Sequence, residues 1–291
     1  MNMLGGNIVN FGVVFCFIIL FADSQSIGSN NVEPFKYLQT RLISDGFDKT
    51  AIKKLYKDPK VRFDAKSMAI MFSYKESELN YGQFTSPESI KTAREYMETH
   101  RRHLFKAEKT YGVNKNIITG IILVETRFGT NLGKRSVLNT LSIIASLAAP
   151  DVRELFWEKT QDSMKISNKR FHKKATVKSK WAYSELKAFL KYAFSEKINP
   201  VTIPGSFAGA MGIAQFMPSN LSLFGQDGDM DSCVDLFNHA DAIASIANYL
   251  KQHGWYSGIT YKKAHEVVLH YNRSKYYADT ILEIAKRLMQ L

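Results

Sequence analysis

The sequence predicts a mainly α-helical protein, and three observations predict it. Apolar residues recur at helical spacing through most of the chain. Residues typical of helix starts and ends bracket several of these segments. No convincing run of alternating apolar and polar residues indicates a strand. The 291 residues, 45% of them hydrophobic, are enough to bury a core in one large domain or in two closely packed ones.

The first residues are expected to be an export leader and not part of the fold. Residues 8–22 form a short apolar run without charge, and small polar residues follow it. This run is shorter than a typical membrane-spanning helix and resembles the apolar part of a secretory signal. Because no Lys or Arg precedes the run, an uncleaved anchor within residues 1–26 stays open. Export is predicted in either case.

Helical segments follow in order along the chain. They are expected at 33–80, interrupted by Gly46 and by Asp58-Pro59, at 86–112, at 241–253 and at 278–291. The second segment starts with Ser86 as its cap and Pro87 in the first helical position, and Gly112 ends it. The sequence therefore predicts one long helix between Ser86 and Gly112.

The charge of the chain is strongly basic. A formal net charge of +12 implies an anionic partner, such as nucleic acid, an acidic polymer or a membrane surface. Basic residues are concentrated between Trp157 and Trp181, in a segment expected to be a solvated loop or a surface helix. No zinc-ligand spacing, recognition helix or aromatic–glycine RNA motif is present, so no nucleic-acid partner is predicted.

The most informative single residue is Glu125, at the end of the apolar run 117–124. Asn114 can cap the start of this helix and Gly129 can close it. A carboxylate at the edge of an apolar core is desolvated, and desolvation raises its pKa toward the range that a general acid needs. Taken alone, the segment also fits a Glu that pairs with Arg127 or faces water.

Two further segments carry groups that suit a carbohydrate. Residues 204–219 are rich in Gly and Ala, which let backbones approach closely or let a ligand reach main-chain amides. This segment is either a tight packing turn or the floor of a cleft with Ser206 and Gln215 as its polar groups. Residues 271–277 place tyrosines beside an amide, which suits the apolar face and polar rim of a sugar, although such tyrosines also serve ordinary packing.

Residues 227–235 predict a calcium loop. Carboxylates stand at every second position, as in an EF-hand loop, where they converge on a hard cation. Ser232 stands where Gly usually makes the sharp turn, and Asn238 stands at the twelfth position in place of Glu, so a solvated acidic loop is the alternative. The expected ligands are Asp227, Asp229, Asp231, the backbone carbonyl of Cys233, and Asp241 from the next helix.

Together and in this order, these segments resemble the membrane-bound lytic murein transglycosylase B family. The segments that carry the resemblance are 124–129, 205–218, 241–249, 253–255, 271–272 and 277. The resemblance implies a lysozyme-like catalytic core set into a helical domain with an EF-hand-like loop. Some members carry a small β domain between the last two motifs. Here only residues 256–270 separate them, so that domain is expected to be absent.

The resemblance also implies domains and site residues. The domains are a signal peptide or anchor at 1–26, an N-terminal helical domain at 30–110, a catalytic core with the calcium loop at 111–240, and C-terminal helices at 241–291. Glu125 matches the single catalytic acid/base of the family. The residues that match its saccharide-binding residues are Ser206, Met211, Gln215, Tyr249, Tyr271, Asn272 and Tyr277. A structural Ca²⁺ is implied, with no organic cofactor.

The implied activity is that of a peptidoglycan lytic transglycosylase in cell-wall turnover or remodelling. Glycosidases position a pair of carboxylates, whereas no second Asp or Glu lies near Glu125 in the sequence. The implied location is the periplasm, with membrane contact only through an uncleaved leader. The implied partners are peptidoglycan glycan strands and, beyond them, cell-wall synthesis or hydrolysis proteins. The alternatives are a hydrolytic muramidase on the same fold, a non-catalytic peptidoglycan-binding protein and a calcium-regulated interaction module.

Overall fold

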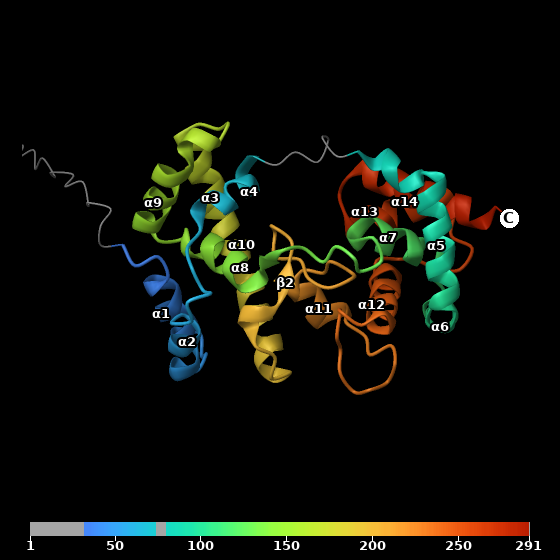
Figure 1. Cartoon of the computed structure of the whole chain (residues 1–291), viewed down its shortest axis with the longest axis horizontal. Helices are drawn as coiled ribbons and strands as arrows, with labels where there is room; N and C mark the ends of the chain where they lie inside the picture. The colour runs from blue at the N-terminus through green and yellow to red at the C-terminus, as the bar shows by residue number, and fades with distance from the viewer. Residues whose placement is uncertain (1–31, 74–79, 291) are drawn as a thin grey trace, which may run out of the picture. The chain divides into compact units, whose positions relative to one another are not determined.

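The computed structural model describes residues 32–73 and 80–290, and the predicted leader lies outside this range. Helices make up almost all of the regular secondary structure of the described residues, as the sequence predicts (Figure 1). Residues Val32–Leu291 form one compact unit. Among the described residues, no helix combines the length and apolar character needed to cross a membrane.

The elements follow one another along the chain as helices of very different length. The N-terminal ones are α1 (Lys36–Ser44), α2 (Lys49–Leu55), α3 (Ala65–Met68) and α4 (Ile70–Ser73). The central ones are η3 (Tyr81–Thr85), α5 (Pro87–Thr99), α6 (Arg101–Tyr111), α7 (Lys115–Thr126), α8 (Val137–Ser146), α9 (Pro150–Thr160), η4 (Gln161–Ser163) and α10 (Asn168–Ser195). The C-terminal ones are η5 (Pro200–Thr202), α11 (Pro218–Phe224), α12 (His239–Gln252), α13 (Tyr261–Tyr271) and α14 (Lys275–Met289).

The strands of the described chain are two short ones, β1 (Arg135–Ser136) and β2 (Pro204–Gly205). They pair antiparallel, with Arg135 opposite Gly205. Residues 127–134, which begin with a turn and contain no helix or strand, carry the chain from α7 to β1 and α8 (Figure 1). The β pair therefore ties this segment to the start of the Gly-rich segment 205–218.

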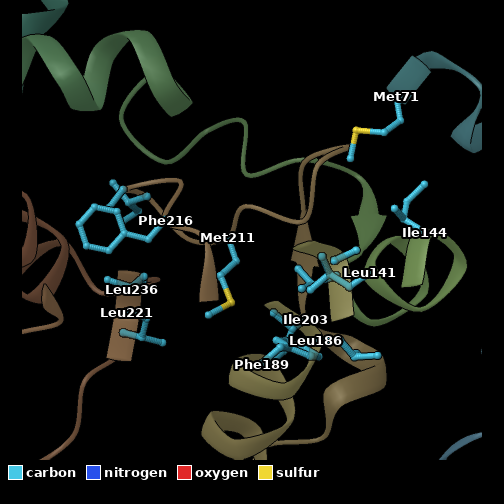
Figure 2. Packing of buried hydrophobic residues seen from close by; sticks show 14 of the residues in the cluster. Met71, Leu141, Ile144, Leu186, Phe189, Ile203, Met211, Phe216, Leu221 and Leu236 are labelled. Carbon is cyan, nitrogen blue, oxygen red and sulfur yellow. The ribbon is translucent and has the colours of Figure 1, made fainter. Parts of the chain in front are cut away.

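The helices pack in two groups. Helices α1, α3 and α9 contact α8 or α10, whereas α5, α6, α12 and α14 all contact α7. Helix α11 touches both α10 and α12. One cluster of buried apolar residues extends through both groups, and Figure 2 shows Leu141 of α8 and Phe189 of α10 near Ile203. Helices of the predicted 30–110 domain contribute to both groups, and its boundaries stay a prediction.

The predicted helix between Ser86 and Gly112 is two helices, and the prediction of one is wrong. Helices α5 and α6 meet at His100, whose backbone (φ −105°, ψ 20°) leaves the helical region. The apolar stripe continues from one helix into the other, so the sequence does not reveal the break. The predicted ends are correct, because Ser86 accepts the N–H of Ser89 and Gly112 ends α6 in the left-handed conformation (φ 70°).

The basic segment between Trp157 and Trp181 consists of the end of α9, a short connection that includes η4, and the first half of α10, and α10 has one face in the core. Phe171 of α10 is fully buried and stacks on Phe156 of α9 with ring centroids 5.6 Å apart. Lysines on the other face, such as Lys173, are exposed. The prediction of a surface helix therefore holds for the exposed face of α10, which carries most of the basic residues, and the loop alternative holds only for residues 164–167.

A column of rings joins α5, α6, α12 and the turn after α7. Phe128 stacks on Tyr96 at 4.5 Å, Tyr96 lies 4.3 Å from His100, and His100 stacks on His239 at 4.3 Å. The Tyr96 hydroxyl and His239 Nδ1 share a hydrogen bond of 3.0 Å. Burial, helped by His239 and His103, lowers the pKa of His100 to about 4.

This low pKa predicts that the protein loses stability in mild acid. In the unfolded chain His100 takes up a proton near pH 6.5, whereas in the folded protein it stays neutral down to about pH 4. Because the unfolded state binds more protons between these values, the free energy of unfolding should decrease as the pH falls from 6.5 toward 4. His100→Phe keeps a ring in the column and cannot titrate, so its Tm should depend less on pH over this range. Thermal melts of the two proteins at several pH values measure this, and equal slopes would contradict the role of His100.

Candidate functional site

Glu125 lies in the last turn of α7, a helix that is buried along most of its length. Asn114 caps this helix as predicted, because its side chain accepts the N–H of Asn116 at 2.8 Å. The prediction that Gly129 closes the helix is wrong, since the chain already turns at Arg127, whose backbone is left-handed (φ 48°). The side chain of Glu125 is partly exposed at the point where the buried helix ends.

Tyr277 holds the carboxyl group of Glu125. Its hydroxyl donates a hydrogen bond of 2.7 Å to Glu125 Oε1 from the first turn of α14. The Tyr277 side chain is buried, and burial raises its pKa well above the usual value, with the charge of Glu125 adding to the effect. Tyr277 is therefore always protonated at neutral pH and remains a donor. The predicted rise in the pKa of Glu125 itself stays a prediction.

Further rings extend from Tyr277 as a continuous wall. The ring of Tyr271 lies parallel to that of Tyr277 at 6.3 Å, and Tyr249 of α12 meets Tyr271 edge-on at 5.1 Å. The Tyr271 hydroxyl donates to the Ala214 carbonyl (2.5 Å), and the Tyr249 hydroxyl donates to the His270 carbonyl (2.6 Å). The structure thus brings together three predicted tyrosines from separate segments, and internal hydrogen bonds fix their rings.

The Gly-rich segment lies against the end of α7. The Thr126 hydroxyl donates to the Ile213 carbonyl at 3.2 Å and accepts the N–H of Gly129 at 3.0 Å. The N–H of Ile213 in turn donates to the Leu236 carbonyl at 2.8 Å. At Gly212 (φ +72°) a Cβ would come within 2.4 Å of the Leu236 Cβ, so this approach requires glycine. Thr126 was missed by the sequence reasoning, although a polar residue at a buried helix end was a usable signal.

The predicted polar residues of this segment use some of their polar atoms in hydrogen bonds within the segment. Ser206 Oγ accepts the N–H groups of Ala208 (3.2 Å) and Ala210 (3.1 Å), so this oxygen shapes the turn. Gln215 has a left-handed backbone (φ 46°), and its Nε2 donates to the Gly212 carbonyl at 2.9 Å. The side-chain oxygen of Gln215 has no hydrogen-bond partner among the described residues.

Two other residues predicted to bind the saccharide, Met211 and Asn272, differ in how exposed their side chains are. Met211 is 1% exposed and packs in the core shown in Figure 2, so its side chain is not presented to a ligand. Asn272 is partly exposed, and its Oδ1 accepts the N–H of Ser274 at 3.1 Å, which leaves its amide donors available.

Three carboxylates of the acidic loop converge. Asp227, Asp229 and Asp241 each place an oxygen within 4.8 Å of the others. Asp241 is buried and accepts the N–H groups of Gly228 and Asp235, both at 2.7 Å. Burial raises the pKa of Asp241, and the charges of Asp229 and Asp227 add to this. A divalent cation that prefers oxygen ligands would relieve this repulsion, so the donor set fits Ca²⁺.

The other predicted members of the loop are placed differently. Asp231 is exposed and accepts the N–H of Cys233 at 2.8 Å. Ser232 adopts the left-handed conformation (φ 72°) that Gly usually supplies in such a loop. The serine therefore makes the sharp turn at the position where the sequence lacks the usual glycine. That the Cys233 carbonyl is a ligand stays a prediction. The EF-hand-like geometry of the loop also stays a prediction.

These features agree with comparisons to known proteins. The transglycosylase SLT domain family matches residues 31–264, and the chain belongs to this family. A relative from Escherichia coli (strain K12), membrane-bound lytic murein transglycosylase B, is 34% identical over 176 residues. That alignment covers 60% of this chain and 41% of the relative, so the chain spans less than half of the relative's length.

Solved structures share the fold. Soluble lytic transglycosylase SltB1 from Pseudomonas aeruginosa superposes with a TM-score of 0.70 at 23% identity, over 88% of this chain and 98% of that one. The Escherichia coli lytic transglycosylase Slt35 in complex with calcium gives a TM-score of 0.68 at 22% identity, over 89% and 93% of the two chains. The predicted family and fold class are therefore confirmed.

The contact at Gly212 predicts a position-specific loss of stability. Gly212→Ala adds a methyl group that collides with Leu236, so we expect the free energy of unfolding to fall by about 2–4 kcal/mol, from overpacking plus backbone strain. Gly46→Ala is the matched control, because Gly46 also has a positive φ (+94°) but nothing within 4 Å of the added Cβ. Its loss should be only about 1 kcal/mol. Urea unfolding measures both, and equal losses would show that the Leu236 contact is unimportant.

Proposed function

We propose that this protein is a peptidoglycan lytic transglycosylase. It would cleave the β-1,4 bond between N-acetylmuramic acid and N-acetylglucosamine and leave 1,6-anhydro ends, in cell-wall turnover or remodelling. The observation that carries the proposal is Glu125 at the exposed end of a buried helix, hydrogen-bonded to Tyr277. Membership of the transglycosylase SLT domain family and the named activity of the Escherichia coli relative support it.

The mechanism needs one carboxyl group and not two. Glu125 is the only Asp or Glu between Glu108 and Asp151, and residues 197–226 contain none. Glu125 would first protonate the bridging oxygen, with the substrate's own N-acetyl group supporting the positive charge at C1. The carboxylate would then take the proton of the muramyl C6 hydroxyl as that oxygen bonds to C1. No water is consumed, and Glu125 ends protonated again.

Tyr277 would position this carboxyl group in both steps. A hydrogen bond from a neutral donor strengthens when the acceptor becomes a carboxylate, so it favours the state that forms after the first proton transfer. Tyr271 would offer its partly exposed ring to the sugar, and the buried rings of Tyr249 and Tyr277 would hold that ring in place. The residues that we assign to the saccharide site are Ser206, Gln215, Tyr249, Tyr271, Asn272 and Tyr277, with Met211 buried beneath them.

Replacing Glu125 tests the chemistry directly. Glu125→Gln keeps an oxygen that accepts from Tyr277 but removes the transferable proton, so release of anhydro products from purified murein should fall by about 10²- to 10⁴-fold. Mass spectrometry of the digest measures this, since an anhydro end is one water lighter than a reducing end. Glu95→Gln, on an exposed position of α5, is the control and should retain activity.

Two outcomes would contradict the proposal. Substantial activity of the Glu125→Gln variant would show that Glu125 is not the catalytic acid/base. Reducing ends from the unaltered protein would identify a muramidase on the same fold.

We also propose that the acidic loop binds a structural Ca²⁺. Its support is the convergence of Asp227, Asp229 and Asp241, together with the calcium complex of the similar Slt35. Asp231 and the Cys233 carbonyl would complete the ligands. When bound, the ion would hold the loop between α11 and α12 in its curled form, and no step of the reaction passes through it.

Calcium should therefore stabilise the folded protein. At a Ca²⁺ concentration about 100 times the Kd, binding to the folded state alone contributes about 2.7 kcal/mol. For a chain of this size this raises the Tm by roughly 5–10 °C over the chelated protein. Calorimetry with and without chelator measures the shift in Tm. Asp229→Asn should abolish this shift, whereas Asp162→Asn, at an exposed position outside the loop, should leave it unchanged. Identical melts with and without Ca²⁺ would refute the site.

Export to the periplasm is proposed from residues 1–26, either cleaved or kept as an anchor. The named membrane attachment of the Escherichia coli relative supports this placement. Glycan strands are the proposed partner, and cell-wall synthesis or hydrolysis proteins are a further class. We also propose that residues 111–240 form the catalytic core, between helical segments at 30–110 and 241–291.

A further inference from the structure

A cavity lies at the other end of the helix that carries Glu125. It has a volume of about 490 Å³ and is lined by Asn114 and Ile117, at the start of α7. The remaining lining comes from Glu108 and Gly112 around the end of α6, the segment from Trp255 to Ala264, and the last turns of α14. At 1.5 Å per residue, about 16 Å of helix separate Asn114 from Glu125. The cavity shares no lining residue with the proposed saccharide site.

Three aromatic side chains line this cavity. Tyr256 is 52% exposed and Tyr261 is 67% exposed, whereas Trp255 is buried. Ile117, Leu282 and other apolar side chains also line it. Tyrosine presents an apolar ring face and a polar tip, so two exposed tyrosines at a cavity mouth suit a ligand with both apolar faces and hydroxyl groups.

Polar groups of the lining have hydrogen-bonding capacity that the protein itself does not use. The hydroxyls of Tyr256, Tyr261 and Ser257 have no hydrogen-bond partner among the described residues, and neither does the ammonium group of Lys286. Glu108 uses Oε1 to accept the N–H of Lys115 at 3.1 Å, which leaves its second oxygen.

The charges of the lining favour a neutral ligand. Glu108 and Lys286 are the two charged side chains that line the cavity, and they are of opposite sign. An anionic lipid or an acidic polymer would therefore gain no net attraction there, in contrast to the basic surface of the chain as a whole. A neutral sugar, with apolar ring faces and several hydroxyls, fits the lining better than either.

We propose that this cavity is a second saccharide-binding site, which binds an N-acetylhexosamine unit of a glycan strand against Tyr256 and Tyr261. The volume lies in the range of about 300–1,000 Å³ that is usual for ligand pockets. The choice of a glycan rests on the proposed function. Two saccharide sites at opposite ends of α7 would hold a polymeric substrate more tightly than either site does alone, because the second contact becomes intramolecular.

The test uses the full chain carrying Glu125→Gln, so that binding is measured without turnover. Chitotetraose, a soluble β-1,4-linked N-acetylglucosamine oligomer, is titrated while NMR follows the indole N–H signals of the three tryptophans. Trp255→Phe assigns the signal of Trp255, which reports on this cavity. We expect a saturable shift of that signal, and an apparent Kd about tenfold or more weaker when Tyr256→Ala and Tyr261→Ala are added.

Controls separate binding from folding and from the proposed activity. Tyr37→Ala removes an equally exposed tyrosine (52%) from α1 and should leave the Kd unchanged. Melting curves check that the double variant is folded, as expected for exposed side chains. An unmoved Trp255 signal, an unchanged Kd in the folded double variant, or a shift with octanoate but not with chitotetraose would overturn the proposal. Failure of the proposed function would instead appear as missing anhydro products from the unaltered protein.

Discussion

The burial of α7 is the constraint on which the rest of the structure depends. Four helices, α5, α6, α12 and α14, pack around it, and most of the residues between its caps are removed from water. An apolar helix of this kind is stable only while its neighbours cover it. Because the burial fixes the helix rigidly, it also fixes the place where Glu125 leaves the core and where Tyr277 of α14 meets it.

From the end of α7 a chain of backbone contacts reaches the acidic loop. Thr126 bonds to Ile213, and Ile213 bonds to Leu236 only because Gly212 allows the approach. Leu236 lies between the carboxylates of the loop and the start of α12, where Asp241 is buried. A cation in this loop would therefore stabilise the frame of the proposed saccharide site without touching the reacting atoms.

The two ends of α7 are used differently. The C-terminal end presents a carboxyl group among tyrosines whose hydroxyls are all engaged in internal hydrogen bonds, an arrangement that fixes groups for chemistry. The N-terminal end borders a cavity whose tyrosines have free hydroxyls and exposed rings, an arrangement that suits binding. One rigid helix thus sets the spacing between a proposed reaction site and a proposed holding site.

The sequence alone determined the features that depend on neighbours within a few residues. Local chemistry accounts for the helical periodicity, the caps at Ser86 and Asn114, and the left-handed Gly112. The alternating carboxylates of residues 227–231 can likewise be recognised within a few residues of sequence. Tertiary packing decided what local chemistry leaves open: the break at His100, the early end of α7 at Arg127, and the burial of Met211. It also decided that Tyr277 reaches Glu125, a contact between residues 152 positions apart. Such a contact depends on how two helices pack, and no interaction between sequence neighbours encodes that packing.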